Sequence, residues 1–86
     1  MSVDKTFKAI SSEVARLLRE ERTSRHLSLN EVSARAGLSR QMVSYIEQEE
    51  RNPSLDTLLR LTLALGVDLD EIIRRARISV PKGKPG

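Results

Sequence analysis

Residues 27–53, LSLNEVSARAGLSRQMVSYIEQEERNP, constrain the fold of this chain more than any other segment. Ser28 and Glu31 match the pattern of a capping box, in which each side chain satisfies a free N–H group of the first helical turn. Gly37 is placed to end that helix, because glycine adopts the left-handed conformation without a steric clash. Ser39 then begins a second helix. The segment therefore predicts two short helices joined by a tight turn.

Three further helices are predicted around this pair. The first runs from about Ser11 to Arg25, where apolar residues recur at intervals of three and four. Ser54 begins a leucine-rich helix that Gly66 ends, and Asp68 begins the last helix. These boundaries divide the chain into an N-terminal arm, a folded domain and a flexible basic tail, at residues 1–10, 11–78 and 79–86.

Composition favours an all-α domain with an aliphatic core. The chain has 86 residues, of which 38% are apolar, with one Phe, one Tyr and no Trp. That length fits one domain with one modest core. The chain has no cysteine, and its single histidine, His26, has no second histidine as a partner. We therefore expect no disulfide, no metal site and no cofactor.

Neither hydropathy nor charge indicates a membrane protein. No apolar run approaches the roughly 20 residues that span a bilayer, and the N-terminus lacks the apolar stretch of a signal peptide. The expectation is a soluble, cytoplasmic protein. The net charge is +3, which permits nucleic-acid binding without requiring it. Much of the positive excess lies near the C-terminus, and a solvated chain end is its simplest interpretation: Arg74, Arg75, Arg77, Lys82 and Lys84.

The second helix of the central pair separates into an apolar and a polar face. Val43 and Ile46 point inward on a helical wheel, with Met42 at the margin. Arg40 can bind guanine N7 and O6 in bidentate fashion, and Gln41 can bind adenine N6 and N7 in the same way. Both lie at the N-terminal end of the helix. In proteins that read DNA with such a helix, this is the end that enters the major groove. The predicted base contacts are Arg40, Gln41, Ser44 and Tyr45.

Contacts to phosphate are expected beside this polar face. The helices that begin at Ser28 and Ser39 would point free N–H groups and positive dipole ends at the DNA backbone. Acidic side chains in the same region must face away from the phosphates. The predicted phosphate contacts are Ser28, Ser39, Gln48, Arg51 and Asn52.

Residues 27–53, together with the SLDTLLRLTLALGVDLDEI that follows, resemble the Cro and lambda-repressor-like helix-turn-helix family, also called the xenobiotic-response-element family. The resemblance covers roughly Val14 to Ile73. It implies a five-helix lambda-repressor-like domain, dimers on palindromic sites, and base contacts from the start of the third helix. The matching residues are Ser28, Glu31, the Ala36-Gly37-Leu38-Ser39 turn, Ile46-Glu47, Asn52-Pro53-Ser54 and Ala64-Leu65-Gly66-Val67.

The resemblance also predicts one ion pair and identifies three departures. Family members often pair a first-helix arginine with a glutamate late in the third helix, which implies a pair between Arg22 and Glu47 here. Leu29 stands where a phosphate-binding glutamine is common. Glu21 occupies a position that is more often apolar, and Ser33 replaces a common alanine.

Two functions remain open from the sequence. The first is a transcriptional regulator, expected to be a repressor, that binds double-stranded DNA as a homodimer. The second is an antitoxin or other interaction protein that masks a partner, such as a toxin or co-regulator, through the basic segment 74–86 and regulates its own operon. No nucleophile–base set and no glycine-rich phosphate loop is visible, so no enzyme is expected. Surplus apolar residues form the expected dimer surface: Leu65, Val67, Leu69, Ile72 and Ile73.

Overall fold

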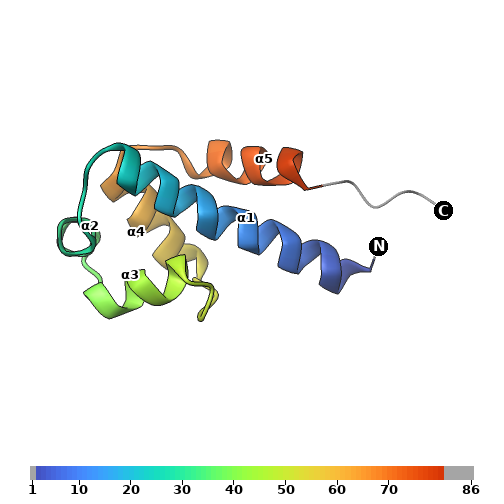
Figure 1. The fold of residues 1–86 in the computed structure, drawn as a ribbon, viewed down its shortest axis with the longest axis horizontal. Coiled ribbons are helices and arrows are strands. Elements are labelled where there is room, and N and C mark those ends of the chain that lie inside the picture. Colours follow the sequence, from blue (N-terminus) through green and yellow to red (C-terminus); the bar gives the residue numbers. More distant parts are fainter. Residues whose placement is uncertain (1, 81–86) are drawn as a thin grey trace.

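The structure, a computed structural model, describes residues 2–80 and is all-α over that range (Figure 1). This is the fold class that the sequence predicts. Helix α5 packs along α1, and α2 packs against α3 and α4. The five helices are α1 (Val3–Ser24), α2 (Leu29–Ala36), α3 (Arg40–Glu47), α4 (Leu55–Leu65) and α5 (Leu69–Ser79).

The serine side chains begin three helices as predicted. Ser28, Ser39 and Ser54 each accept a hydrogen bond from the backbone N–H group three residues later. The capping box between Ser28 and Glu31 is complete. The capping expected from Asp68 is wrong, because its side chain makes no such bond although the residue does precede α5. The start of α5 is therefore set by its packing rather than by a side-chain cap.

Four of the helices end in a residue with left-handed backbone conformation. Gly37 and Gly66 have φ angles of 70° and 77°, as the sequence predicts. His26 after α1 and Glu49 after α3 have φ angles of 57° and 62°. In each case the residue that follows donates its N–H to a carbonyl in the last helical turn. The chain thus uses one stop geometry four times, with glycine at only two of the positions.

Helix α1 is longer than predicted. It begins at Val3 rather than at about Ser11, so the segment expected to be an N-terminal arm is helical from residue 3. Ser2 accepts a hydrogen bond from the Lys5 N–H and caps this extension. At the other end, α5 continues to Ser79 and Val80 is buried, so the predicted tail does not begin at residue 79. Residues 81–86 of that tail lie outside the described part of the chain.

The core is aliphatic and draws on all five helices. Its largest fully buried apolar side chains are Leu18, Ile46, Ile72, Val32 and Val43. Leu65 and Ile72, expected at the dimer surface, are 4% and 0% exposed and belong to this core. That expectation is therefore corrected for these two residues, because the chain's own helices cover them. Val67, Leu69 and Ile73 are half-buried.

Helix α4 leaves three leucines outside the core. Leu55, Leu59 and Leu63 are exposed and recur at every fourth position. Residues at that spacing share one face of a helix. They form an apolar stripe on the surface, hereafter the leucine stripe, while Leu61 and Leu65 of the same helix are buried.

Candidate nucleic-acid interface

Helix α3 presents its polar face to solvent. Val43 and Ile46 are each 1% exposed and anchor the helix to the core. Met42 is half-buried and packs against the same core, as expected at the margin. On the opposite face Arg40, Gln41 and Gln48 are exposed, and Ser44 and Tyr45 are half-buried. The predicted reading residues therefore lie on one accessible face of α3. Helix α3 itself lies at the edge of the molecule (Figure 1).

Most of these polar side chains are paired with one another. Gln41 Nε2 donates a hydrogen bond to the hydroxyl of Tyr45, one turn later. Gln48 Nε2 donates to Ser44 Oγ at 2.7 Å. The Arg51 guanidinium carbon lies 5.7 Å from the centre of the Tyr45 ring, within cation–π range. Arg40 makes no hydrogen bond or ion pair within residues 2–80, which leaves its five donors available.

The N-termini of α2 and α3 differ in their suitability for phosphate. Ser39 accepts a hydrogen bond from the Met42 N–H, and no acidic residue lies in the first turn of α3. At α2 the backbone N–H of Ser28 donates to Glu31 at 3.0 Å, so this group is already satisfied. Hydrogen bonds from that N–H and from the Ser28 hydroxyl lower the pKa of Glu31. A carboxylate thus shares the start of α2, and α3 offers phosphate the more favourable field.

The predicted ion pair between Arg22 and Glu47, behind α3, is confirmed. Arg22 donates from Nε and Nη2 to the two carboxylate oxygens of Glu47 at 2.7 and 2.9 Å. Its Nη1 also donates to the Leu27 carbonyl oxygen at 2.9 Å. The side chains are 14% and 9% exposed, and hydrogen bonding to Glu47 raises the pKa of Arg22. This guanidinium therefore joins α1, α3 and the segment that leads into α2.

Three of the four acidic residues in segment 27–53 have partners within the chain. Glu47 binds Arg22, Glu31 caps α2, and Glu49 accepts a hydrogen bond from the Ser12 hydroxyl of α1. Glu50 is exposed and makes no side-chain bond within residues 2–80. These hydrogen bonds and the ion pair fix the positions of three of the four carboxylates. That these carboxylates face away from phosphate stays a prediction.

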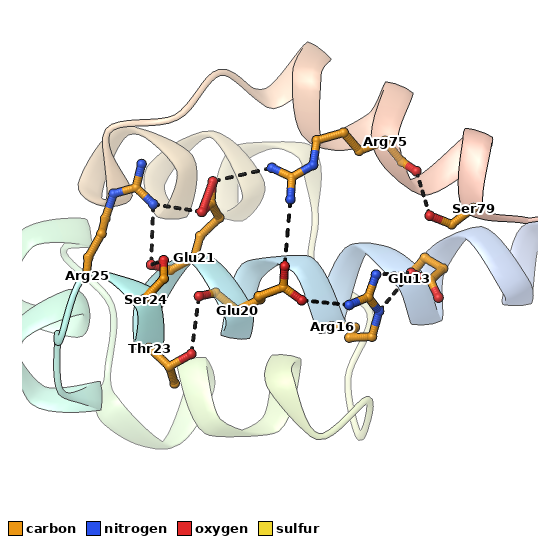
Figure 2. A network of polar contacts seen from close by, with 9 residues as sticks. All are labelled: Glu13, Arg16, Glu20, Glu21, Thr23, Ser24, Arg25, Arg75 and Ser79. Atoms are coloured by element: carbon orange, nitrogen blue, oxygen red, sulfur yellow. Dashed lines mark hydrogen bonds and ion pairs between the residues drawn. The ribbon is translucent and has the colours of Figure 1, made fainter.

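The three departures from the family pattern each have a structural explanation. Leu29 packs against the core instead of offering a polar group. Ser33 is buried and donates its hydroxyl hydrogen to the Asn30 carbonyl at 3.0 Å. Glu21 pairs with Arg25, just after α1, at 2.8 Å and with Arg75 of α5 at 3.4 Å, so a charge replaces an apolar contact there (Figure 2).

Arg75 belongs to a polar network between α1 and α5 that the sequence did not predict. It lies 3.4 Å from Glu21 and 3.9 Å from Glu20, and Arg16 bridges Glu20 and Glu13 along α1 (Figure 2). Spacing of three and four residues could have identified the pairs within α1. No local pattern connects Arg75 to residues more than 50 positions earlier.

The basic segment 74–86 is only partly described. Arg75 is held by Glu20 and Glu21, while Arg74 and Arg77 are exposed on α5. Lys82 and Lys84 lie outside the described residues. None of these observations favours the masking function that the sequence left open.

The fold, the exposed polar helix and the ion pair behind it define a helix-turn-helix protein. Residues 18–72 match the helix-turn-helix family HTH_3, and the chain belongs to this family. It is 42% identical over 66 residues to the uncharacterized HTH-type transcriptional regulator y4dJ of Sinorhizobium fredii. That alignment covers 77% of this chain and 80% of the relative. The chain is thus a member of the helix-turn-helix transcriptional regulators.

Two further comparisons agree with this assignment. The uncharacterized HTH-type regulator Rv0474 of Mycobacterium tuberculosis is 33% identical over 64 residues, which are 74% of this chain and 46% of that protein. The restriction-modification controller protein C.AhdI of Aeromonas hydrophila has a similar structure, with a TM-score of 0.68 and 33% identity. The superposition covers 73% of this chain and 94% of C.AhdI.

Among residues 2–80, no three His, Cys, Asp or Glu side chains gather as metal ligands would. No helix in the same range is long and apolar enough to cross a membrane.

Proposed function

We propose that the chain is a sequence-specific transcriptional repressor that binds a pseudo-palindromic operator as a homodimer in the cytoplasm. The observation that carries this proposal is the accessible polar face of α3. The buried pair Val43 and Ile46 supports that face from beneath, and the Arg22–Glu47 pair supports it from behind. A rigidly held row of this kind is what direct reading of a major groove requires.

Within this proposal, Arg40, Gln41 and Ser44 contact base edges, and Tyr45 belongs to the same reading face of α3. Two α3 helices about 34 Å apart enter successive major grooves on one side of the duplex. Ser39 and Arg51 contact phosphate and fix the register, with Ser28, Gln48 and Asn52 as further contacts. A dimer seated on a promoter blocks access to it, which makes repression the direction we propose.

For the dimer we propose the leucine stripe of α4 as the main contact. Its three side chains are exposed in the single chain, and association would remove their apolar surface from water. Val67, Leu69 and Ile73 are half-buried and expose less apolar surface, so we place them at the margin of the contact. A self-complementary patch is the simplest route to a two-fold dimer.

Selection of DNA from a random pool by the purified chain tests the proposed function. We expect the bound fragments to share an inverted repeat, because two equivalent α3 helices related by a two-fold axis read two equivalent half-sites. A shared single half-site would contradict the homodimer. A bound pool without any shared sequence would contradict sequence-specific recognition altogether.

Replacement of Arg40 by alanine should weaken binding to the selected operator by about 1–3 kcal/mol and relax the choice at one base pair. The reason is that Arg40 is the one reading residue without a partner inside residues 2–80, so its donors are available to guanine. Fluorescence anisotropy on the operator and on random duplex measures both affinities. Equal weakening on the two duplexes would instead make Arg40 a phosphate contact.

A further inference from the structure

The side chains of Gln41, Tyr45 and Arg51 form a connected unit on the exposed face of α3. The Gln41 amide nitrogen donates to the Tyr45 hydroxyl oxygen, and the Arg51 guanidinium lies over the Tyr45 ring. Gln41 and Arg51 are exposed, whereas Tyr45 is half-buried. Tyr45 is thus the central member, held by contacts at both its hydroxyl and its ring.

The hydrogen bond leaves the carboxamide of Gln41 with a defined set of free groups. A primary amide has two N–H donors and one carbonyl acceptor. One donor is engaged by Tyr45, and the second donor and the carbonyl oxygen remain available. One N–H and one carbonyl side by side are what adenine N7 and N6 require for bidentate recognition. When Tyr45 engages the N–H that points away from the carbonyl oxygen, the other N–H and the oxygen stay free side by side for adenine.

The position of Arg51 depends on the turn after α3. Glu49 adopts the left-handed conformation there, and its carboxylate accepts a hydrogen bond from Ser12 of α1. The turn brings Arg51, six residues after Tyr45, back over the aromatic ring. A planar guanidinium can stack on a ring and still direct N–H groups at a phosphate. Stacking and a phosphate contact are compatible in one arginine.

We propose that Tyr45 is a positioning residue for Gln41. Its hydroxyl oxygen accepts a hydrogen bond from one amide N–H of Gln41 and so presents the remaining N–H and the carbonyl to adenine. Arg51 meanwhile holds the Tyr45 ring in place. This inference rests on the proposed function and assigns Tyr45 a role through Gln41 rather than a base of its own. The half-site then contains an A·T pair whose selection depends on three side chains, of which one touches the base.

The test uses the full chain with the Tyr45→Phe substitution, which removes the hydroxyl and keeps the ring for Arg51. Affinities are measured for the selected operator, for its single-base-pair variants and for random duplex. We expect Gln41→Ala to abolish the preference at one A·T pair and Tyr45→Phe to reduce the preference at that same pair by about tenfold. Binding to random duplex should not change. The double variant should lose no more discrimination than Gln41→Ala alone.

Arg51→Lys is a second test of the unit formed by Gln41, Tyr45 and Arg51. Lysine keeps the charge for phosphate but does not provide the planar stacking surface. We expect a smaller loss of preference at the pair that Gln41 reads, with little change on random duplex. Ser79→Ala, which removes a hydroxyl near the end of α5, is the matched control and should leave the whole base profile unchanged. Thermal melts verify that each variant is folded.

Several outcomes would overturn the inference. A loss of preference at a different base pair in Tyr45→Phe would make Tyr45 a direct reader. An unchanged profile in that variant would show that the hydrogen bond has no role in reading. Selection of a G·C pair where Gln41→Ala loses its preference would exclude the adenine assignment. A wild-type chain that prefers no sequence would overturn the proposed function, and this inference with it.

Discussion

His26 and Glu49 occupy backbone positions that glycine fills elsewhere in the same chain. Their φ angles of 57° and 62° place them in the left-handed region, like Gly37 and Gly66. A residue with a Cβ atom loses roughly 1 kcal/mol there relative to glycine, because Cβ approaches the following carbonyl oxygen. Glu49 has a hydrogen bond from Ser12 that offsets part of this loss. The exposed His26 has no side-chain bond within residues 2–80.

His26→Gly should therefore stabilise the fold by about 0.5–1 kcal/mol, the relief of strain exceeding the added freedom of the unfolded chain. Urea unfolding of the purified chain measures the change. Gly66→Ala is the reverse control and should destabilise, since a Cβ there meets no atom within 4 Å and only the φ of 77° is unfavourable. Destabilisation by both changes would show that the His26 side chain has a favourable contact.

Glu31 predicts a pH dependence of stability. Hydrogen bonds from Ser28 lower its pKa in the folded state, so the folded chain holds fewer protons on this group than the unfolded chain in acid. Its contribution is present above the unfolded pKa and is lost as the pH falls through the lowered folded pKa. Glu31→Gln keeps an oxygen acceptor for the Ser28 N–H but removes the titration. We expect the melting temperature of Glu31→Gln to fall less steeply with decreasing pH than that of the unsubstituted chain, below the ordinary pKa range of glutamate. Identical acid profiles would contradict this.

At the scale of helices, two kinds of contact hold α5 against α1, and their magnitudes differ. Ile72 and Ala76 are each 0% exposed in the interface. Arg75 makes ion pairs at 3.4 and 3.9 Å on the outside of it, with its side chain 36% exposed (Figure 2). Loss of a buried isoleucine side chain costs about 2–5 kcal/mol, whereas exposed ion pairs contribute about 0–1 kcal/mol. The apolar contact therefore decides whether α5 is docked.

Ile72→Ala should lower the free energy of unfolding by about 2–4 kcal/mol, and Arg75→Ala by less than about 1 kcal/mol. Chemical denaturation at low and at high salt measures both. Only the small effect of Arg75→Ala should shrink with salt, because ions screen exposed pairs. A large and salt-sensitive effect of Arg75→Ala would show that the polar network is the principal tie between the two helices.

For the molecule as a whole, the leucine stripe is an apolar surface that no other part of the described chain covers. Leu63 is 79% exposed, although the same helix buries Leu61 and Leu65. Water contact with a stripe of this kind is unfavourable, and under the proposed function a second copy is the partner that a pseudo-palindromic operator requires. Association and DNA binding are then linked, because only the dimer engages both half-sites.

Leu63→Asp should therefore dissociate the proposed dimer and weaken binding to the full operator at least about tenfold, since a desolvated carboxylate opposes association. Sedimentation velocity gives the oligomeric state, and anisotropy gives the affinity. Ile78→Asp is the matched control, because Ile78 is 76% exposed but lies on α5, outside the stripe. Dissociation by Ile78→Asp and not by Leu63→Asp would move the interface to α5.

The sequence by itself determined the ends of the central helices. Ser28 and Ser39 bond to N–H groups three residues away, and Gly37 supplies a backbone conformation at its own position. Such signals act within one helical turn and need no information about distant residues. The apolar spacing in α3 likewise predicted which side chains lie beneath the helix and which lie on its surface. The early start of α1 was missed because Ser2 alone is a weak local signal.

Only the tertiary structure decided which apolar and charged residues meet. The leucines of α4 look alike in sequence, and the packing of α2, α1 and α5 against this helix separates those that are buried from those in the stripe. The same packing turned Leu65 and Ile72 from expected surface into core, and brought Arg75 to Glu21. Helix packing depends on side chains far apart in the chain, so no local pattern contains it. The Arg22–Glu47 pair was foreseen only through the family resemblance, for the same reason.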